Sequence, residues 1–460
     1  MINGNCFVIC LLFVVGMGCP AWSQEQNKEK AAMAANAQAI RPLADGFVTV
    51  FKSPDPKQIY AYSPGIARLD SGRLVATLDL GGPGMKAWPE PKGLRDGQPI
   101  QTKIFTSDDA GNSWTHRADA PLMHARPFTA GKSLYVLGNA ENLVIIRSDD
   151  HGDTWSKPSP LTKGEDWIQA PCNVHYANGC VYLVMNKRPY PPPKAWPVSI
   201  EAPVLMRGKL GDDLTRRESW TFATTLAFRD IVKPEQLDWF GVPFFESKFD
   251  RQTMPAPGRA MDPIGWLETN VVQFTDPDHL WYDPSGRTFH LWSRAHTGGT
   301  GYAAIAKVVE QGDKPGTGEM TTMLEKVPSG KIMLYVPCPG GQMKFHVLFD
   351  EQTKLYWLLS TQATDSMIRP NRMPADRYSL PNNERRRLQL HFSKNMIDWC
   401  FAGLVATGPV EKASRHYASM TIDGDDLVVL SRSGDEQANS PHDGNLITFH
   451  RVKDFRGLVY

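Results

Sequence analysis

Two stretches of the sequence are nearly the same: TSDDAGNSWTH at residues 106–116 and RSDDHGDTWSK at residues 147–157. Both contain the octet Ser-x-Asp-x-Gly-x-Ser/Thr-Trp. In such an octet the Asp and Ser side chains can hydrogen-bond turn backbone, the glycine can adopt a positive φ, and the tryptophan can fill the gap beside the next unit. The repeat therefore predicts a turn that closes a hairpin in the same way each time, as an architecture of repeated small sheets requires.

Weaker copies of the octet occur further along the chain. Residues 393–399 (SKNMIDW) are one residue shorter and have no glycine, and residues 211–222 (GDDLTRRESWTF) form a badly eroded fourth copy. All four copies are interpreted as structural turns without a catalytic role.

The rest of the chain has the sequence pattern of short β-strands separated by turns. From about residue 45 onward, short apolar runs alternate with turn residues, as in IARLDSGRLVATLDL at 66–80, where Asp70-Ser71-Gly72 forms the turn. The sequence contains 38 Gly, 36 Pro and 13 Trp, which suits many short strands and turns. Because no amphipathic helical window follows residue 43, the sequence predicts an all-β domain over residues 44–460.

The N-terminal residues are expected to be a targeting segment. An apolar run from Phe7 to Met17 followed by Ala21-Trp22-Ser23 fits a cleaved signal peptide over residues 1–23, followed by a disordered or short helical leader over residues 24–43. The product is therefore expected to be exported, to the periplasm or the extracellular space, in preference to a lipid-anchored form at Cys19. No later stretch has the length of a membrane span.

Charge and cysteine content exclude several classes of protein. The formal net charge is +1, so no broad cationic surface is expected to bind nucleic acid. Four cysteines follow the signal segment, too few for a disulfide-built scaffold. A turn at Asn178-Gly179 would pair Ala177 with Cys180, which places Cys172 out of register for a disulfide with Cys180.

The octets resemble the Asp boxes (BNR repeats) of sialidase-type β-propellers. This resemblance implies a single propeller domain. Dividing about 415 residues by about 55–65 residues a blade gives six or seven blades, with seven favoured. Because unrelated activities share this fold, the octets by themselves indicate no particular reaction.

A retaining sialidase is expected to have three arginines that bind the substrate carboxylate, a Tyr–Glu nucleophile pair and an Asp acid. The segment YSPGIARLDSGRLVA at 62–76 has the frame of the first arginine motif, but Ser63 occupies the arginine position. Loss of such a guanidinium–carboxylate contact costs on the order of 2–5 kcal/mol. Sialidase chemistry is therefore taken as the second hypothesis.

The first hypothesis comes from a resemblance to ulvan-lyase-like propellers, which present His, Tyr and Arg in that order. His124, Tyr190 and Arg207 match this order, so the resemblance implies that His124 and Tyr190 act as base and acid, in either assignment, and that Arg207 neutralises the uronate carboxylate. A second histidine of those lyases is absent, and Asn142 or Asn139 stands near its place. The alternative is a loop histidine bonded to backbone, a packed tyrosine and a surface arginine.

Polar residues near expected strand ends are the candidate substrate contacts, because inner strands and loops of a propeller converge on one face. The candidates are Asn142, His175, Arg188, Arg294, His296, Arg415 and His416. The same regions also contain Glu268, Asn270, His346, Glu384, Arg385, Tyr417, His442 and Asp443. The alternative interpretation of most of these residues is a polar channel filled by water and ion pairs.

No cofactor is required for either reaction. His296, Cys338, His346 and Cys400 have the chemistry of zinc ligands, and a structural zinc or calcium ion remains a hypothesis.

Three functions remain open from the sequence: a polysaccharide lyase or related exo-acting enzyme on an acidic, uronate-containing glycan, a sialidase-like glycoside hydrolase, and a propeller that binds glycans without cleaving them. The expected partner is an acidic polysaccharide or oligosaccharide, and the protein is expected to be a monomer.

Overall fold

The computed structural model describes residues 40–231, 250–296, 301–365, 368–375 and 382–460. The predicted signal peptide and the predicted leader up to residue 39 lie outside the described residues. Residues Pro42–Tyr460 form one compact unit. No helix among the described residues has both the length and the apolar character needed to cross a membrane.

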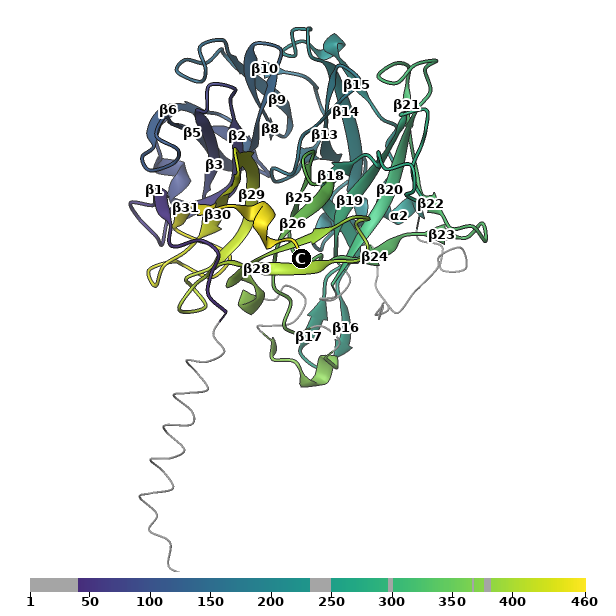
Figure 1. The fold of residues 1–460 in the computed structure, drawn as a ribbon. Helices are drawn as coiled ribbons and strands as arrows, with labels where there is room; N and C mark the ends of the chain where they lie inside the picture. Colours follow the sequence, from purple (N-terminus) through teal and green to yellow (C-terminus); the bar gives the residue numbers. More distant parts are fainter. Residues whose placement is uncertain (1–39, 232–249, 297–300, 366–367, 376–381) are drawn as a thin grey trace, which may run out of the picture. The chain divides into compact units, whose positions relative to one another are not determined.

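The compact unit is built from six antiparallel sheets, counted over the described residues, arranged one after another around a common axis (Figure 1). This is a six-bladed β-propeller, and the first five blades run from an inner to an outer strand in chain order. The first blade contains β2 (Tyr60–Arg68), β3 (Leu74–Gly81), β5 (Gln98–Ser107) and β6 (Thr115–Ala120), with β4 (Gly93–Arg95) beside β5. The second contains β7 (Met123–Ala130), β8 (Ser133–Ala140), β9 (Asn142–Ser148) and β10 (Ser159–Pro160).

The third blade has an interrupted inner strand. It contains β11 (Trp167–Ile168), β12 (His175–Ala177), β13 (Cys180–Lys187), β14 (Ala202–Lys209) and β15 (Trp220–Phe222). The fourth contains β18 (Gly265–Val272), β19 (Thr288–His296), β20 (Tyr302–Glu310) and β21 (Met320–Met323), with β24 (Tyr335–Pro337) also pairing with β20. The fifth contains β25 (His346–Asp350), β26 (Leu355–Thr361), β27 (Arg387–Ser393) and β28 (Cys400–Thr407).

The sixth blade closes the ring with strands from both ends of the compact unit. It contains β29 (Arg415–Asp423), β30 (Asp426–Ser433), β31 (Leu446–Val452) and β1 (Val48–Lys52). β1 pairs antiparallel with β31 and so supplies the outer strand of the last blade. The first inner strand, β2, contacts β7 on one side and β29 on the other, which completes the circle.

Short elements occupy the connections. They are two hairpins, β16 (Thr253–Ala256) with β17 (Arg259–Met261) and β22 (Glu325–Lys326) with β23 (Ile332–Met333), the helix α2 (Phe228–Ile231), and the 3-10 helices η1 (Pro83–Ala87), η2 (Pro197–Ile200), η3 (Arg217–Ser219), η5 (Pro370–Arg372), η7 (Asn382–Arg385) and η8 (Phe455–Leu458). The all-β class is therefore confirmed.

The preference for seven blades was wrong. Dividing the chain into equal blades assumes short connections, but the connection from β15 to β18 runs from Phe222 to Gly265, and that from β26 to β27 runs from Thr361 to Arg387. Residues in connections of this length were counted as part of a seventh blade when the chain length was divided by the length of a blade.

The two octets form the same turn between the third and outer strands of the first two blades. The Ser107 hydroxyl accepts from the Gly111 N–H at 2.8 Å, and Asp109 accepts from the Ser113 N–H at 2.9 Å. Residues 148–154 repeat these bonds at the same distances. Gly111 has φ 90°, and the Trp114 ring packs against Phe449 of the neighbouring blade.

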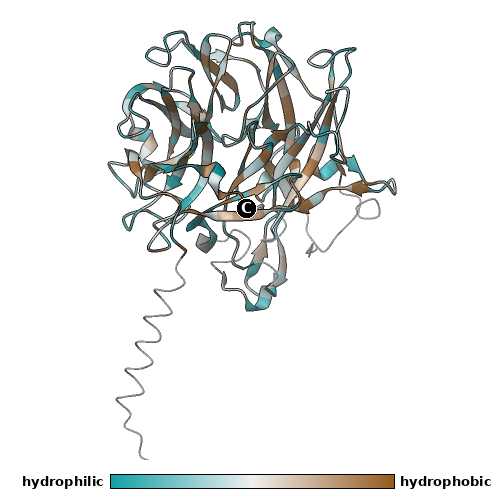
Figure 2. Ribbon diagram, in the orientation of Figure 1, coloured by the Kyte–Doolittle hydropathy of each residue, from teal (hydrophilic) through white to brown (hydrophobic). Residues whose placement is uncertain are grey.

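Apolar side chains concentrate on the strands, and the turns are hydrophilic (Figure 2). The core is divided into clusters between neighbouring sheets; one of them joins Trp357 of the fifth blade to Val429 of the sixth. The Asn178-Gly179 turn pairs Ala177 with Cys180 as predicted, and the four described cysteines are free.

Candidate functional site

Four inner strands contain a β-bulge near their beginning. The register shifts between Tyr62 and Gly65 in β2, between Met123 and Arg126 in β7, between Leu267 and Thr269 in β18 and between His416 and Ser419 in β29. At each bulge one non-glycine residue has a positive φ: Ser63 (42°), His124 (58°), Glu268 (54°) and Tyr417 (51°). Such a conformation costs about 1–3 kcal/mol per residue and re-aims a side chain. The inner strands surround the central channel of the propeller, and all four bulges lie near the beginning of their strands. Their repetition at equivalent positions therefore indicates a candidate site at this end of the channel.

An arginine connects two of the bulged residues. Arg294 of β19 donates from Nη1 to the Tyr417 hydroxyl at 2.6 Å and to Glu268 Oε2 at 3.1 Å. Arg294 is 1% exposed, whereas Tyr417 is half-buried. Tyr417 is therefore the member of this group that a ligand can reach.

Two more arginines surround the same tyrosine. The guanidinium carbons of Arg385 and Arg432 lie 5.7 and 5.2 Å from the centre of the Tyr417 ring. Arg432 also lies 4.1 Å from the ring of Tyr62. Among the described residues, no carboxylate lies within salt-bridge distance of Arg385 or Arg432. Glu268 pairs with Arg294 and acts on the other two guanidinium groups at longer range, and Asp443 also acts on Arg432.

These neighbours affect the protonation of the group. Burial raises the pKa of the Tyr417 phenol, Arg294 opposes this, and Glu268 adds to it. Burial and the adjacent Arg432 and Arg294 lower the pKa of Arg385 to about 10, which leaves it charged at neutral pH. An excess of buried guanidinium charge beside a reachable phenol suits a ligand that carries a carboxylate.

The other two bulges are held together by Asp79 of β3, which is completely buried. Asp79 accepts from the His124 backbone N–H at 2.7 Å and from the Thr102 hydroxyl at 2.8 Å, and it is also hydrogen-bonded to Ser63. Because β3 lies beside β2 and beneath β7, one carboxyl group fixes both bulges.

His124 is neutral and oriented. Its Nδ1 lies 2.9 Å from Asn139 Oδ1, which accepts only, so Nδ1 has the proton and Nε2 has the lone pair. Burial, together with charge repulsion from Arg95, Arg188 and Arg126, lowers the pKa of His124 to about 3, although the hydrogen bond to Asn139 raises it. His124 can therefore accept a hydrogen bond or a proton through Nε2 at neutral pH.

Asp79→Asn should remove a pH dependence of stability. Burial raises the pKa of Asp79 to about 7, so between pH 4 and 7 the folded state binds a proton that the unfolded state has lost. That contribution is complete below pH 4 and is lost as the pH rises through 7, so the free energy of unfolding should fall by on the order of a few kcal/mol across this range. Urea denaturation at pH 4.5, 6 and 8 should show a smaller slope for Asp79→Asn, whereas an unchanged slope would contradict the assignment. Asp70→Asn, in a surface turn, is the control.

The predicted catalytic trio is not brought together. Arg207 of β14 donates to Glu310 at 2.6 Å and to the Gly318 carbonyl at 2.7 Å, which makes it a structural link between the third and fourth blades. Tyr190 is exposed and donates to Asp230 at 2.8 Å. Neither residue shares a partner with His124, which alone of the three lies at a bulge.

The predicted substrate contacts separate into two groups. Arg294 is at the centre of the site, His416 accepts from Arg385 at 3.1 Å, and Arg188 lies close enough to His124 to affect it electrostatically. The remaining four have structural partners: Asn142 accepts from the Glu165 N–H, His175 bonds Gln273, His296 bonds the Pro263 carbonyl, and Arg415 donates to the carbonyls of Ser414 and Gly434.

The predicted metal ligands do not converge. Cys338 is buried in an apolar cluster, and Cys400 packs against a different one. His346 accepts from the Met420 N–H. The described residues contain no group of three or more His, Cys, Asp or Glu side chains placed to hold a metal ion.

Sequence reasoning missed Asp79 and Arg432 and named Glu268, Arg385 and Tyr417 without assigning them roles. The available signal was their order along the chain, Glu268, Arg294, Arg385 and then Tyr417, which provides a glutamate, two arginines and a tyrosine in successive blades. Ser63, at the position of the missing arginine, lies beside Tyr62, whose ring contacts Arg432. Arg432, in the neighbouring sixth blade, is the third guanidinium group near Tyr417.

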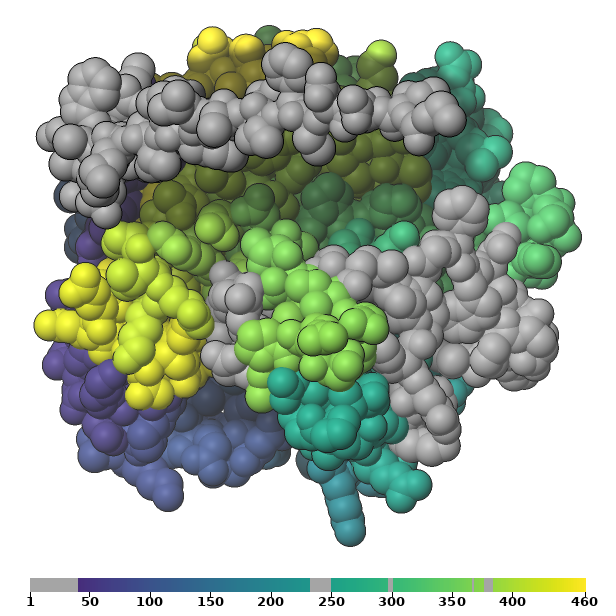
Figure 3. Space-filling model, turned by 90° about the horizontal axis from the view of Figure 1, so that it is seen from below, coloured from purple at the N-terminus to yellow at the C-terminus, as the bar shows by residue number. Residues whose placement is uncertain are grey.

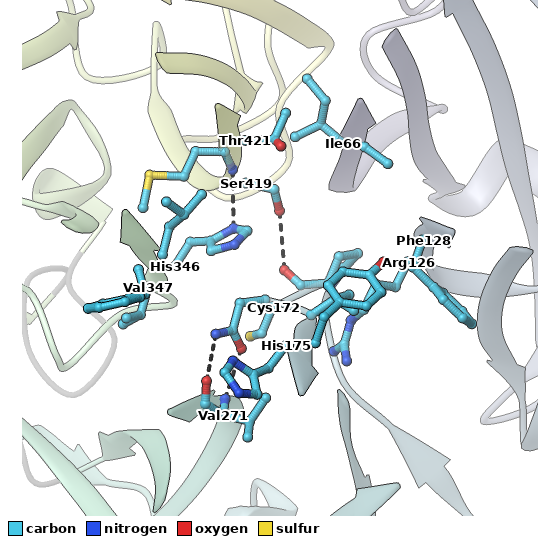
Figure 4. Close-up of a pocket in the computed structure, with 18 of the residues that line it drawn as sticks. Ile66, Arg126, Phe128, Cys172, His175, Val271, His346, Val347, Ser419 and Thr421 are labelled. Atoms are coloured by element: carbon cyan, nitrogen blue, oxygen red, sulfur yellow. Dashed lines mark hydrogen bonds between the residues drawn. The ribbon is translucent and has the colours of Figure 1, made fainter. Parts of the chain in front are cut away.

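A cavity of about 370 Å³ lies at the other end of the channel (Figure 4). It is lined by inner-strand residues that follow the bulges, among them Ile66, Phe128 and Thr421, and by His346 at the start of β25. Lys344, whose Nζ donates to the Ala418 carbonyl and the Ser419 hydroxyl, and Ser419, which donates to the Pro171 carbonyl, fill the channel between this cavity and the bulged residues. The cavity is therefore separate from the candidate site.

Long connections border the candidate site. The hairpin β16–β17 and the segment 368–375 lie side by side (Figure 3), and Arg259 donates to the Met373 carbonyl at 2.6 Å. Trp196, in the connection before β14, has the Arg294 guanidinium 5.3 Å from its ring centre and forms an aromatic wall beside the arginines.

No protein-family model matches the chain, and no curated protein matches it. Among solved structures, the Hadza microbial sialidase Hz136 has 14% identity and a TM-score of 0.51, over 88% of this chain and 68% of that chain. An α-L-arabinanase of Penicillium chrysogenum complexed with arabinobiose has 12% identity and a TM-score of 0.46, over 91% and 100%. A Trypanosoma rangeli sialidase mutant displaying trans-sialidase activity has 12% identity and a TM-score of 0.49, over 91% and 60%.

At these identities the likeness concerns the fold alone. The chain has the fold of the sialidase-type β-propellers. The resemblance inferred from the octets is confirmed at that level.

Proposed function

We propose that the protein is a glycoside hydrolase that acts on an acidic sugar at the bulged end of the propeller channel. The observation that carries the proposal is the placement of Arg294, Arg385 and Arg432 around the reachable Tyr417, with Glu268 paired to Arg294. The sialidase-type fold, shared with a protein named as a sialidase, supports it as an analogy.

In the proposed reaction the substrate carboxylate binds the arginine group and replaces water around it. The Tyr417 oxygen attacks the anomeric carbon, its proton passes to Glu268, and the departing oxygen takes a proton from water at the open site. In the second step a water molecule attacks the anomeric carbon and gives its proton to the hydroxide that the first step left, and Tyr417 recovers its proton from Glu268 as the bond between its oxygen and the sugar breaks.

Tyrosine suits this role because it is neutral in the resting site. A carboxylate nucleophile would repel the carboxylate of the sugar, whereas a phenol does not. The three guanidinium groups then stabilise the phenoxide as it leaves in the second step.

A uronate lyase is the second candidate, favoured by the neutral His124 with a free Nε2 lone pair. The two reactions give different products. Incubation with uronate polysaccharides and with sialosides, followed by ultraviolet absorbance and by assay of released sugar, separates them. Saturated acidic sugar without a rise in absorbance supports hydrolysis, and absorbance from a new C4–C5 double bond overturns it in favour of elimination.

Arg385→Gln should reduce kcat/KM on the active acidic substrate by about 30-fold or more, because removing one partner of a buried guanidinium–carboxylate contact costs about 2–5 kcal/mol. The measurement is initial rate against substrate concentration. Arg372→Gln, in the exposed segment Pro370–Arg372, is the matched control. An unchanged kcat/KM for Arg385→Gln would remove the carboxylate-binding role.

A further inference from the structure

Lys344 is a buried cation that the proposed reaction does not use. It lies two residues before β25, the inner strand of the fifth blade, and it is 1% exposed. Among the described residues, no carboxylate lies within salt-bridge distance of its ammonium group, and Glu268 acts on it only at longer range. Burial of an ammonium group without a paired carboxylate costs stability, so its place in the structure calls for an explanation.

The ammonium group of Lys344 binds the bulge that contains Tyr417. Nζ donates to the Ala418 carbonyl at 2.6 Å, to the Ser419 hydroxyl at 3.1 Å and to the Tyr417 carbonyl at 3.4 Å. The register of β29 with β30 passes from His416 directly to Ser419, which leaves Tyr417 and Ala418 in the bulge. Because a bulge interrupts the hydrogen-bond ladder, its carbonyl groups need another donor, and Lys344 is that donor.

The same contacts connect the bulge at Tyr417 to the bulge of the first blade. The Ser419 hydroxyl, which accepts from Lys344, donates to the Pro64 carbonyl at 2.8 Å. Pro64 lies within the register shift of β2. A side chain from the fifth blade therefore fixes the bulge of the sixth blade against that of the first.

The equivalent bulge in β7 has a neutral donor. The carbonyl of Ala125, which follows the bulged His124 as Ala418 follows Tyr417, accepts from the Thr77 hydroxyl at 2.5 Å. A hydroxyl group is therefore sufficient to satisfy such a carbonyl in this fold. At Tyr417 the donor is charged instead, and a positive charge near this residue favours the phenoxide that leaves in the second step of the proposed reaction.

We infer that Lys344 is a positioning residue, which holds Tyr417 in its positive-φ conformation with the hydroxyl on Arg294. Without the ammonium group the carbonyls of the bulge lose their donor. Tyr417 can then leave the costly conformation, which turns its side chain away from Arg294. The role rests on the proposed function, because it takes Tyr417 as the nucleophile, but the conformation of the bulge can be observed without turnover.

The charge of Lys344 changes within the pH range of an assay. Burial, together with charge repulsion from Arg126, lowers the pKa of Lys344 to about 8, although Cys172 and Glu268 raise it. The titratable and charged groups that act on Lys344 or contact it come from β7, the segment before β12, β18, β29 and β25; in that order they are Arg126, Cys172, Glu268, Tyr417 and His346.

Four of these neighbours lose their protons in other pH ranges. Burial lowers the pKa of Arg126 to about 10 and raises that of the Cys172 thiol to about 11. Burial also raises the pKa of the Tyr417 phenol, and it lowers the pKa of His346 well below its usual range. A decrease in activity near pH 8 is therefore expected from Lys344 and from none of these four.

The first experiment measures kcat from pH 6 to pH 10 on the 4-nitrophenyl glycosides of sialic acid and of glucuronic acid. The wild type should lose kcat by about tenfold or more as the pH rises through 8, because the bonds of a charged donor are lost. Lys344→Gln should have a lower kcat at pH 7 and no decrease at pH 8. Asp79→Asn, which removes a group with a pKa of about 7, and Lys354→Gln, which removes an exposed lysine, should keep the decrease. A wild-type kcat that is constant from pH 7 to 9, or a decrease that persists in Lys344→Gln, overturns the positioning role.

The second experiment is a crystal structure of Lys344→Met beside that of the wild type. In the variant, Tyr417 should have a negative φ and its hydroxyl should lie beyond hydrogen-bond distance of Arg294. Lys344→Gln gives the same comparison where Lys344→Met does not fold. A variant that keeps φ near 51° and the contact with Arg294 overturns the positioning role. If the wild type cleaves neither glycoside, the proposed function is wrong, and the crystal structures still decide whether Lys344 holds the bulge.

Discussion

Tyr417→Phe should reduce kcat on the active acidic substrate by at least about 10³-fold, because it removes the proposed nucleophile and leaves its surroundings in place. The ring stays between Arg385 and Arg432, and Arg294 keeps its bond to Glu268 at 3.1 Å. Since the substrate carboxylate still meets three guanidinium groups, KM should change little. Steady-state kinetics on an aryl glycoside of the active sugar gives both constants, and the good leaving group makes the first step independent of acid catalysis.

Tyr60→Phe is the matched control, because Tyr60 is a tyrosine at the start of β2 in the neighbouring blade whose OH donates to the Lys57 carbonyl at the surface. It should keep full activity. A Tyr417→Phe variant with more than about a tenth of wild-type kcat, and an unchanged melting temperature, would exclude covalent catalysis by this tyrosine. A histidine-based elimination would then be the better account, and His124→Ala would test it.

The fold was predictable because its signals are local. An octet such as Ser107–Trp114 closes a turn with its own side chains, and the Asp70-Ser71-Gly72 turn joins β2 to β3 as the sequence indicates. The blade number was not predictable, because it depends on how many residues the connections consume. No pattern in the sequence indicated that the connections from Phe222 to Gly265 and from Thr361 to Arg387 are so long.

The site was harder to predict because it depends on bulges. If their strands were regular, the sequence would not distinguish Glu268 and Tyr417 from the other residues of the inner strands. The positive φ at each of them re-aims the side chain, and nothing in the residue types Glu or Tyr favours that conformation. Asp79, which anchors the bulges at Ser63 and His124, lies on a neighbouring strand and had no sequence signal of its own.

Arg207 shows the opposite case, in which the order along the chain predicted chemistry and the packing gives the residue structural partners. Glu310 is completely buried and accepts from Arg207 at 2.6 Å, from the Tyr182 hydroxyl at 2.9 Å and from the Gly316 N–H. An arginine held this way, between β14 and β20, cannot also neutralise a substrate at the channel mouth. Substitution of Arg207 should therefore lower the free energy of unfolding and leave the reaction unaffected.

Glu310→Ala should lower the free energy of unfolding by about 3–5 kcal/mol, because it leaves the Arg207 charge buried with only the Thr221 hydroxyl and the Gly318 carbonyl as partners. Urea denaturation gives the change. The double variant Arg207→Met, Glu310→Leu should recover most of the loss, since an apolar pair of similar volume carries no desolvation penalty, and Lys209→Met on the same strand should have little effect. Under conditions where Arg207→Met is folded, kcat should equal that of the wild type. A variant with wild-type urea midpoint and no turnover would restore Arg207 to catalysis, because only a role in the reaction can abolish activity without a cost in stability.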